Sequence, residues 1–471
     1  MHSFFNLVFS ILRDSLHLIV PAVVVCLAGI LIFWLCYRKK WNGERKFPWT
    51  KALAVLCLSC WLVILVGATL FRPDSVGVSY SNLHFFRAWR EAWNQSSVQG
   101  WLNVLLNVAL FLPLGLLLPL LGRFFRKWYV TPSAGLLLSL IIETVQYFTC
   151  RGFFDVDDLF CNTLGTALGF CILMMLRSLI CRAERSPKRA VYYAVFPLVF
   201  LTVLLGISGA YQLQKYGNLE DAPSFTANTR DLSWTLNCEL KSDADPVKIY
   251  HMEPFTKKTA GEFGENFASR LGITMPEIDY YDNSTLYMNH STGDFLMINY
   301  FDRSYDYSIG TPPETDFGAI EDPEERQSAL REELLAFGIT MPDKAEFLVG
   351  EGREDTFVCH MIETPSGCVD GKLQCHYNED GRLYSIKNHM VTAMPAGTEP
   401  ILSEEEAYTQ LRAGKASPGE ALEYAEESTV SVNDCRLEYR TDSKGFYRPV
   451  YTFAVCFANG DGLEMLVPAM Q

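Results

Sequence analysis

Ionisable and polar side chains gather in a stretch of the sequence that is otherwise apolar, between Ser139 and Gly169. The stretch reads as the end of one membrane helix, a short loop and the start of the next helix. Its polar members are Glu143, Gln146, Arg151, Asp155, Asp157, Asp158 and Asn162. Each ionisable group inside a bilayer costs at least ~2.5–3.5 kcal/mol, so such groups mark functional sites by default and usually pair with one another. We therefore predict a polar site between membrane helices.

These residue types suit several kinds of chemistry, and the sequence leaves them open. A lipid head-group site would use Arg151 or Arg72 to hold a phosphate, with Glu143 or Asp158 as a base. A Mg²⁺ or Ca²⁺ site would use the carboxylates of Asp155, Asp157, Asp158 and Glu143, although no metal or cofactor is predicted. A path for protons or small solutes is a third reading. The structural alternative is that the cluster ties helices together through hydrogen bonds worth ~0.6–2 kcal/mol each.

Long apolar runs predict six transmembrane helices that would position these residues, since about 20 apolar residues span a bilayer. The predicted spans are 16–37, 51–71, 101–121, 131–149, 157–180 and 190–213. Clusters of Lys and Arg follow the first, third and fifth spans, and the positive-inside rule makes these loops cytoplasmic. Both termini, the polar cluster and everything after residue 213 are then expected on the extracytoplasmic side.

Helical spacing predicts that polar groups from three spans meet at one depth. Asn107, Glu143 and Asn162 each lie about five or six residues from the outer end of a span, roughly 8–10 Å below the surface at ~1.5 Å per residue. Asp158 and Asn162, which are one helical turn apart, share a helix face. Close helix packing is predicted at Pro113, Gly115, Gly165 and Gly169, because Gly-x-x-x-Gly lets a second helix approach.

These residues resemble the VanZ-like family of bacterial membrane proteins. The shared pattern is Asn107-Val-Ala-Leu-Phe-Leu-Pro113-Leu-Gly115 with Pro119, then Ser139, Glu143, Gln146 and Arg151, then Asp155-Val-Asp157-Asp158, Asn162-Thr-Leu-Gly165 and Gly169. The resemblance covers roughly residues 101–176, and the two preceding spans share the general layout. Family members are associated with low-level resistance to teicoplanin and related lipoglycopeptides. The resemblance implies a role in a bacterial cell envelope and does not supply a reaction.

The chain after Leu213 differs in charge and hydropathy. Up to Leu213 there are 19 Lys and Arg against 9 Asp and Glu, which leaves 21 basic and 45 acidic residues of the totals of 40 and 54. This acidity argues against nucleic acid as a partner. Leu271-Gly-Ile-Thr-Met-Pro276 recurs as Phe337-Gly-Ile-Thr-Met-Pro342, after a helical stretch and before strand-like sequence in each case. We predict an α+β domain of repeated helix-plus-antiparallel-sheet units, over 214–345 and 346–471.

The C-terminal portion carries its own pattern. Ser403-Glu-Glu-Glu406-Ala predicts a helix with a capping box, and strand-like sequence follows at Leu437-Glu-Tyr439 and from Tyr447 to Phe453. This pattern is similar to extracytoplasmic YycI-type regulatory domains, which are related to PepSY modules. The resemblance covers about seventy residues, and it implies binding of a protein partner rather than catalysis.

Cysteines in the acidic part raise two further questions. The pairs Cys359-His360 and Cys375-His376 are not expected to bind zinc, because neighbours on a strand point to opposite faces. Disulfides are open to Cys238, Cys359, Cys368, Cys375, Cys435 and Cys456, which allow fifteen complete pairings.

The function predicted from these features is that of a VanZ-like integral membrane protein that lowers susceptibility to lipoglycopeptides through an intramembrane polar site near the outer leaflet. One alternative is a membrane enzyme that acts on a lipid-linked envelope precursor. Another is a membrane-anchored sensor that binds a protein partner through its C-terminal domain. Membrane lipids or the lipid-linked precursor are the expected ligands, and whether the protein is an enzyme stays open.

Overall fold

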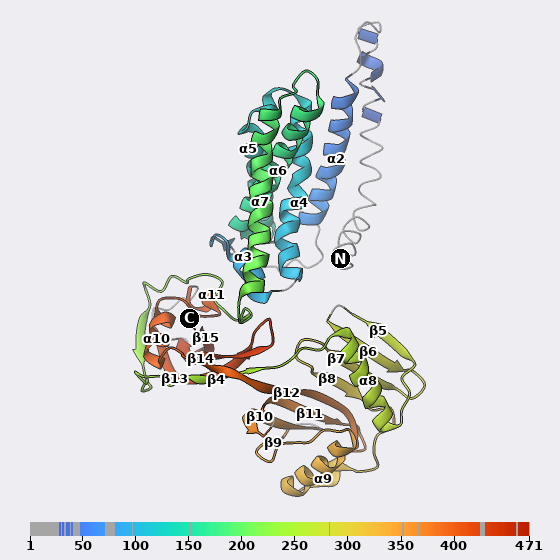
Figure 1. The fold of residues 1–471 in the computed structure, drawn as a ribbon, viewed down its shortest axis with the longest axis vertical. Helices are drawn as coiled ribbons and strands as arrows, with labels where there is room; N and C mark the ends of the chain where they lie inside the picture. The colour runs from blue at the N-terminus through green and yellow to red at the C-terminus, as the bar shows by residue number, and fades with distance from the viewer. Residues whose placement is uncertain are drawn as a thin grey trace. The chain divides into compact units, whose positions relative to one another are not determined.

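The computed structural model divides the chain into two compact units, residues 1–215 and 216–471, called here the membrane unit and the C-terminal unit (Figure 1). Each unit is described by itself. The structure describes residues 28–470 except 30, 33, 38, 41–47, 71–80, 97, 151, 282, 351–352, 366, 424–428 and 458–459.

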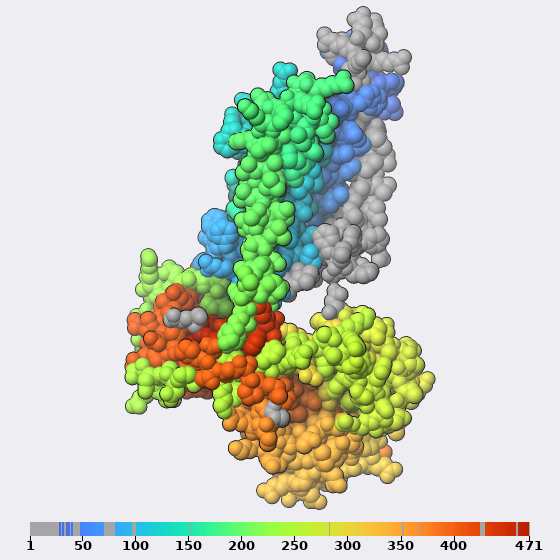
Figure 2. All heavy atoms as spheres, viewed as in Figure 1, coloured from blue at the N-terminus to red at the C-terminus, as the bar shows by residue number. Residues whose placement is uncertain are grey.

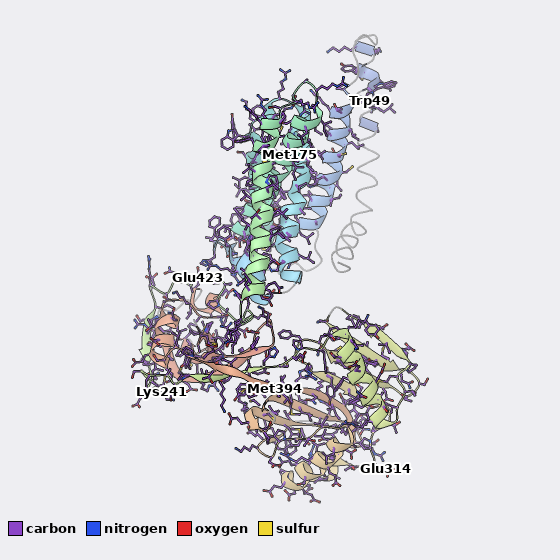
Figure 3. All side chains as sticks on the ribbon, viewed as in Figure 1. Trp49, Met175, Lys241, Glu314, Met394 and Glu423 are labelled. Carbon is purple, nitrogen blue, oxygen red and sulfur yellow. The ribbon has the colours of Figure 1, made fainter. Side chains whose placement is uncertain are left out.

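The membrane unit is built from long apolar helices. They are α2 (Trp49–Leu70), α4 (Val98–Leu121), α5 (Val130–Thr149), α6 (Val156–Ile180) and α7 (Pro187–Leu213). Within the described residues, four helices are long and apolar enough to cross a membrane: Trp49–Thr69, Gly100–Leu121, Val156–Ile180 and Pro187–Leu213. The chain is therefore a membrane protein. Figure 2 shows α7, in green, along the outside of the helical unit, and Figure 3 marks Trp49 at the start of α2 and Met175 in α6.

The predicted count of six spans is not confirmed. The span predicted at 131–149 forms α5, but this helix is not among the four apolar ones, since Glu143 and Gln146 reduce its apolar character. The span predicted at 16–37 lies largely outside the described residues.

A short polar segment lies between α2 and α4, and its Trp89 and Trp93 predict an interfacial helix. It contains strand β1 (Ser81–Asn82) and helix α3 (Arg87–Gln95). Strand β1 pairs in parallel with β2 (Phe154–Asp155), which directly precedes α6. The segment expected to be an interfacial helix is therefore also attached to the loop between α5 and α6.

Helices α4 and α6 pack with their backbones unusually close. A Cβ built on Gly165 would lie 2.0 Å from the carbonyl oxygen of Val108, and one on Gly115 would lie 2.0 Å from that of Thr166. A Cβ on Gly169 would lie 2.2 Å from the carbonyl oxygen of Leu112. Only glycine fits at these positions, so the contact fixes how α6 lies against α4. Helix α4 continues through Pro113 and Pro119.

The C-terminal unit is organised around one 13-stranded sheet made of the described strands β3 to β15. The strands are β3 (Ser233–Leu236), β4 (Val247–His251), β5 (Glu277–Tyr280), β6 (Ser284–Asn289), β7 (Asp294–Asn299), β8 (Tyr305–Ser308), β9 (Glu346–Val349), β10 (Glu354–Thr364), β11 (Gly367–Tyr377), β12 (Leu383–Glu399), β13 (Thr429–Thr441), β14 (Phe446–Phe457) and β15 (Gly462–Pro468). All their pairings are antiparallel except that of β3 with β13.

Two copies of one motif build the larger core. Helix α8 (Lys257–Leu271) precedes β5 to β8, and helix α9 (Pro323–Ala336), which follows the 3₁₀ turn η2 (Phe317–Ala319), precedes β9 to β12. The last strands of the two copies, β8 and β12, pair with each other. Each helix ends at one of the recurring Gly-Ile-Thr-Met-Pro sequences, so the repeated helix-plus-sheet units predicted from that recurrence are present.

The described side chains divide the C-terminal unit at a different place from residue 345. Buried residues of α8, α9 and strands β6 to β12 form one core, which includes Phe267, Leu330 and Leu373. A second core contains Leu411, Phe453 and neighbours from β13 to β15. Strands β9 and β10, most of β11 and the first part of β12 thus belong with the first core, because they complete the sheet on which α9 packs.

The C-terminal helix begins as its sequence predicts. Ser403 caps α10 (Glu404–Arg412), and a capping box is formed with Glu406. A short helix α11 (Gly419–Glu423) follows. Strand β12 leaves the first core and pairs with β4 through residues 394–399, and Figure 3 labels Met394 at this point.

The first residues of the C-terminal unit, 216–218, are held by hydrogen bonds and are called here the stem. The Gly217 N–H donates to the Asp442 carboxylate at 2.6 Å, and Arg448 Nη1 donates to the Gly217 carbonyl oxygen at 3.0 Å. Asn218 N–H donates to Ser443 Oγ at 2.8 Å, and Ser443 N–H donates back to the Asn218 carbonyl at 2.9 Å. The stem is therefore held by the turn between β13 and β14.

The six cysteines considered for disulfides are free thiols. Cys359, for example, lies opposite Gly371 on β11, and its Sγ is 3.8 Å from Met390 Sδ. The thiol is thus packed against a methionine and not against another cysteine.

Candidate functional site

The start of α6 carries two aspartates that organise the surrounding chain. Asp155 is the N-cap of α6, and its carboxylate accepts the Asp157 N–H at 2.7 Å. Asp157 is 1% exposed, and its two oxygens accept the N–H groups of Phe86 at 2.6 Å and Ala88 at 2.7 Å. Negative side chains at a helix N-terminus are favoured by the helix dipole. Asp157 therefore connects the residue before α3 and the first turn of α3 to the start of α6.

Asn82 and Glu143 extend this arrangement on either side of Asp155. Asn82 Nδ2 donates to Asp155 Oδ1 at 3.1 Å. The backbone N–H of Asp155 donates to Glu143 Oε2 at 3.1 Å, and the Glu143 side chain is buried. Burial raises the pKa of Asp155, while its hydrogen bonds with Asp157 and Asn82 oppose that rise. Glu143 in α5 is thus bonded to the loop that leads into α6.

Two further pairs connect helices below this loop. Asn107 Nδ2 of α4 donates to Asp158 Oδ1 of α6. Asn162 Nδ2, one turn further along α6, donates to Ser139 Oγ of α5 at 2.9 Å. Asn162 is buried, and its Oδ1 has no hydrogen-bond partner. Leaving a buried amide oxygen without a hydrogen-bond partner costs folding free energy. The Asn162 oxygen can therefore accept a hydrogen bond from a donor on a ligand.

The structure brings most of the predicted site residues together. Six of them hydrogen-bond to one another, to Ser139 or to the segment around the start of α3. They are Asn107, Glu143, Asp155, Asp157, Asp158 and Asn162. Gln146 has a different role, since its Nε2 donates to the Thr69 carbonyl at 3.0 Å and ties α5 to α2. Arg151 and Arg72, the predicted phosphate ligands, lie outside the described residues.

The described carboxylates do not converge as metal ligands. In the part of the chain that the structure describes, no group of three or more His, Cys, Asp or Glu residues is placed to hold a metal ion. Both oxygens of Asp157 instead face backbone N–H groups, and Asp155 Oδ1 accepts from Asn82 and Asp157. The arrangement does not favour the Mg²⁺ or Ca²⁺ reading.

Asn82 is the site residue that the sequence did not reveal. It is buried, and besides bonding Asp155 it accepts the His84 N–H through Oδ1 at 3.1 Å. Its signal in the sequence is weak, since a lone asparagine in a polar stretch predicts a turn as readily as a buried contact.

The assembled site, named here the polar site, comprises Asn82, Asn107, Ser139, Glu143, Asp155, Asp157, Asp158 and Asn162. Its chemistry is that of a fixed set of amides and carboxylates. The amide nitrogens of Asn82, Asn107 and Asn162 each donate to a partner within the site. Such an arrangement can bind a polar head group or exchange a proton at a carboxylate, and it is oriented before any ligand arrives.

Residues 52–177 match the VanZ/LLP1 family model and form a VanZ-like domain. No curated protein matches the chain. The chain is also similar to a solved structure, the Bacillus megaterium YpeB C-terminal domain. That similarity has 14% sequence identity and a TM-score of 0.21, and it covers 47% of this chain and 95% of the other.

Proposed function

We propose that this VanZ-like membrane protein lowers the susceptibility of a bacterium to teicoplanin and related lipoglycopeptides, and that the polar site is the part that acts. The observation that supports this proposal is the assembly of buried and half-buried amides and carboxylates from α4, α5 and α6 at one end of the helices. Groups of this kind are costly in a membrane. The resemblance supplies the antibiotic class.

Within the polar site, we assign different roles to different residues. Asp157, Asp155 and Asn82 are positioning residues, because their hydrogen bonds hold the chain around the start of α6. Glu143 and Asp158 are the groups proposed to meet the ligand. Asn162, which has an oxygen without a partner, supplies a further acceptor below them.

The proposed ligand is a membrane lipid or a lipid-linked envelope precursor, bound near the outer leaflet. The basic clusters after the predicted spans support an extracytoplasmic position for the polar site and for the C-terminal unit. The C-terminal unit is proposed to bind a protein partner, as its resemblance to regulatory domains implies.

The test is the inhibitory concentration of teicoplanin for a susceptible host that expresses the intact chain, Asp158→Asn or Gln146→Leu at equal membrane abundance. Gln146 is the matched control, since it lies on α5 but bonds to α2 rather than to the polar site. We expect protection by the intact chain and by Gln146→Leu, and loss of protection with Asp158→Asn. Equal protection by all three would assign the polar site a structural role, and no protection by the intact chain would refute the proposal.

A second candidate is an enzyme that acts on a lipid-linked precursor, favoured by two carboxylates on neighbouring helices, Glu143 and Asp158. General acid and base pairs have this composition. A reaction on purified lipid that Glu143→Gln and Asp158→Asn each abolish would support this candidate. Unchanged turnover in either variant would exclude general acid and base catalysis by the two carboxylates together.

A further inference from the structure

The segment that Asp157 holds has an apolar surface. Leu83 is 65% exposed and Phe85 is 64% exposed, and Phe86 is also exposed. Phe86 packs edge-on against Phe160 of α6, with ring centroids 5.3 Å apart. Phe153 is also exposed, and it precedes β2, which pairs with β1 next to this segment. The exposed side chains of the group are named here the apolar rim: Leu83, Phe85, Phe86, Phe153 and Phe160. A group of exposed apolar side chains marks a contact with a partner or a membrane.

Several backbone N–H groups of the segment that carries the apolar rim form hydrogen bonds within the protein. The N–H of His84 donates to Asn82 Oδ1, and the N–H groups of Phe86 and Ala88 donate to Asp157. The N–H of Arg87 donates to the His84 carbonyl at 3.4 Å. A loop in water has no need of these partners. Irregular backbone next to hydrocarbon does need them, because lipid offers no hydrogen bonds.

The height of the apolar rim along the helices is set by its attachments. Asp157, which holds the segment, lies in the first turn of the apolar helix Val156–Ile180. Helix α3 continues the segment and packs Trp89 against Trp101 of α4 and Trp93 against Tyr211 of α7. Figure 1 shows α3 beside the end of the helix bundle. Tryptophans are typical of the boundary between membrane and water.

We propose that the apolar rim lies in the bilayer leaflet and contacts lipid acyl chains next to the polar site. The rim is continuous with the apolar helix Val156–Ile180 through Phe160, and its members are uncharged. A soluble protein partner would leave unexplained why the rim lies level with the first turn of an apolar span. Lipid is therefore the occupant that both the composition and the height of the rim support.

The contact also defines the class of ligand for the polar site, and this step rests on the proposed function. The backbone that carries Leu83 and Phe86 is the same backbone whose N–H groups Asp157 holds. A molecule that reaches the polar site past the rim comes from the lipid phase, so it is an amphiphile with a polar head group.

Photocrosslinking of the full chain in phospholipid nanodiscs tests the lipid contact. The photoreactive residue p-benzoyl-phenylalanine replaces Phe85, which it resembles in shape. The positive control is Phe196 in α7, and the negative control is Phe301, which is exposed in the C-terminal unit. We expect irradiation to add the mass of one phospholipid at position 85 and at position 196, and not at position 301.

The same experiment distinguishes the lipid contact from the proposed resistance, since it needs no antibiotic. A crosslink from position 85 to protein, or no adduct while position 196 reacts, would overturn the inference. In the Asp157→Ala background we expect the adduct at position 85 to be lost and that at position 196 to remain. Retention of both adducts would show that the rim does not depend on Asp157, and would refute that part of the argument.

Discussion

Each unit of the protein contains a buried aspartate that holds a distant part of the chain by its backbone. Asp157 in the membrane unit accepts N–H groups from Phe86 and Ala88. Asp442 in the C-terminal unit is 0% exposed and accepts N–H groups from Gly217, Lys444 and Phe446. A buried carboxylate is tolerated in both places because charged hydrogen bonds compensate for its lost hydration.

The two aspartates differ in what else fixes the segment that they hold. Around Asp442 the stem is also bonded by Ser443 and Arg448. The segment held by Asp157 has a two-residue pairing of β1 with β2 and the packing of α3. The comparison teaches that a buried acidic residue in a membrane protein is not by itself a sign of catalysis, since the same bonding pattern occurs in a unit with no apolar span among its described residues.

The largest effect is expected for Asp442→Ala. The change removes three backbone hydrogen bonds to a carboxylate, each worth about 1.5–3 kcal/mol, and should lower the free energy of unfolding of the C-terminal unit by at least about 4 kcal/mol. Urea unfolding of the full chain measures the change. Asp434→Ala is the control, because Asp434 is half-exposed and pairs with Arg436 at the surface. Equal losses for both variants would contradict the role given to Asp442.

A smaller effect is expected when a glycine between α4 and α6 is enlarged. Gly165→Ala places a methyl group 2.0 Å from the Val108 carbonyl and should cost about 2–3 kcal/mol through overpacking. Gly206→Ala in α7 is the control, since nothing lies within 4 Å of its added Cβ. The thermal midpoint of the membrane unit in nanodiscs should fall for the first variant and not for the second. Equal midpoints would show that the helices can separate without cost.

Asp157→Asn should have a local effect, because an amide keeps one of the two acceptors. We expect the loss of about 1–2 kcal/mol of protection at the Phe86 or Ala88 amide, measured by hydrogen exchange of peptides from this segment. Glu91→Gln is the control, since Glu91 pairs with Arg87 one turn away on α3 and is half-exposed. Unchanged exchange in Asp157→Asn would break the parallel with Asp442.

The smallest effect concerns Glu184, which lies between α6 and α7 and accepts from Arg177 at 2.8 Å and Arg126 at 2.9 Å. Its bond to Arg177 lowers the pKa of Glu184 below the ordinary value of 4.5, with Arg126 adding to the effect. The stabilisation is complete above the ordinary pKa and is lost as pH falls through the lowered one. Because the side chain is 34% exposed, solvent screening limits the effect to below ~1 kcal/mol.

The measurement is the thermal midpoint of the full chain between about pH 6 and pH 3, for the intact protein and Glu184→Gln. The thermal midpoint of the intact protein should exceed that of the variant near pH 6, and the difference should disappear as the pH falls. A constant difference over the range would show that the ion pairs do not contribute through charge.

Much of the helical unit could be predicted because its signals are local. The apolar runs at 51–71, 101–121, 157–180 and 190–213 became helices within a few residues of the predicted ends. Likewise, Ser403 and Glu406 formed the predicted capping box, since its two partners are three residues apart. The motif that recurs at Leu271 and Phe337 predicted the repeated helix-plus-sheet units, because each copy of the motif is a short continuous sequence.

The rest depends on contacts between residues far apart in the chain. Asn82 and Asp155 meet only because β1 pairs with β2, and a two-residue pairing has no sequence signature. The role of Asp157 was hidden because its partners are backbone N–H groups, which every residue except proline has. The division of the C-terminal unit into cores could not be placed, since β12 pairs with β8 in one region and with β4 in another.

The long-range pairing of the C-terminal sheet has a consequence for biosynthesis. Strands β3 and β4 leave the ribosome early, but their neighbours β13, β14 and the end of β12 are made well over a hundred residues later. At about 5–20 residues per second, the first two strands wait several seconds or more for their partners. During this interval their unpaired edges are open to the wrong strands, and the second core closes only after β15 and Ala469 have been synthesised.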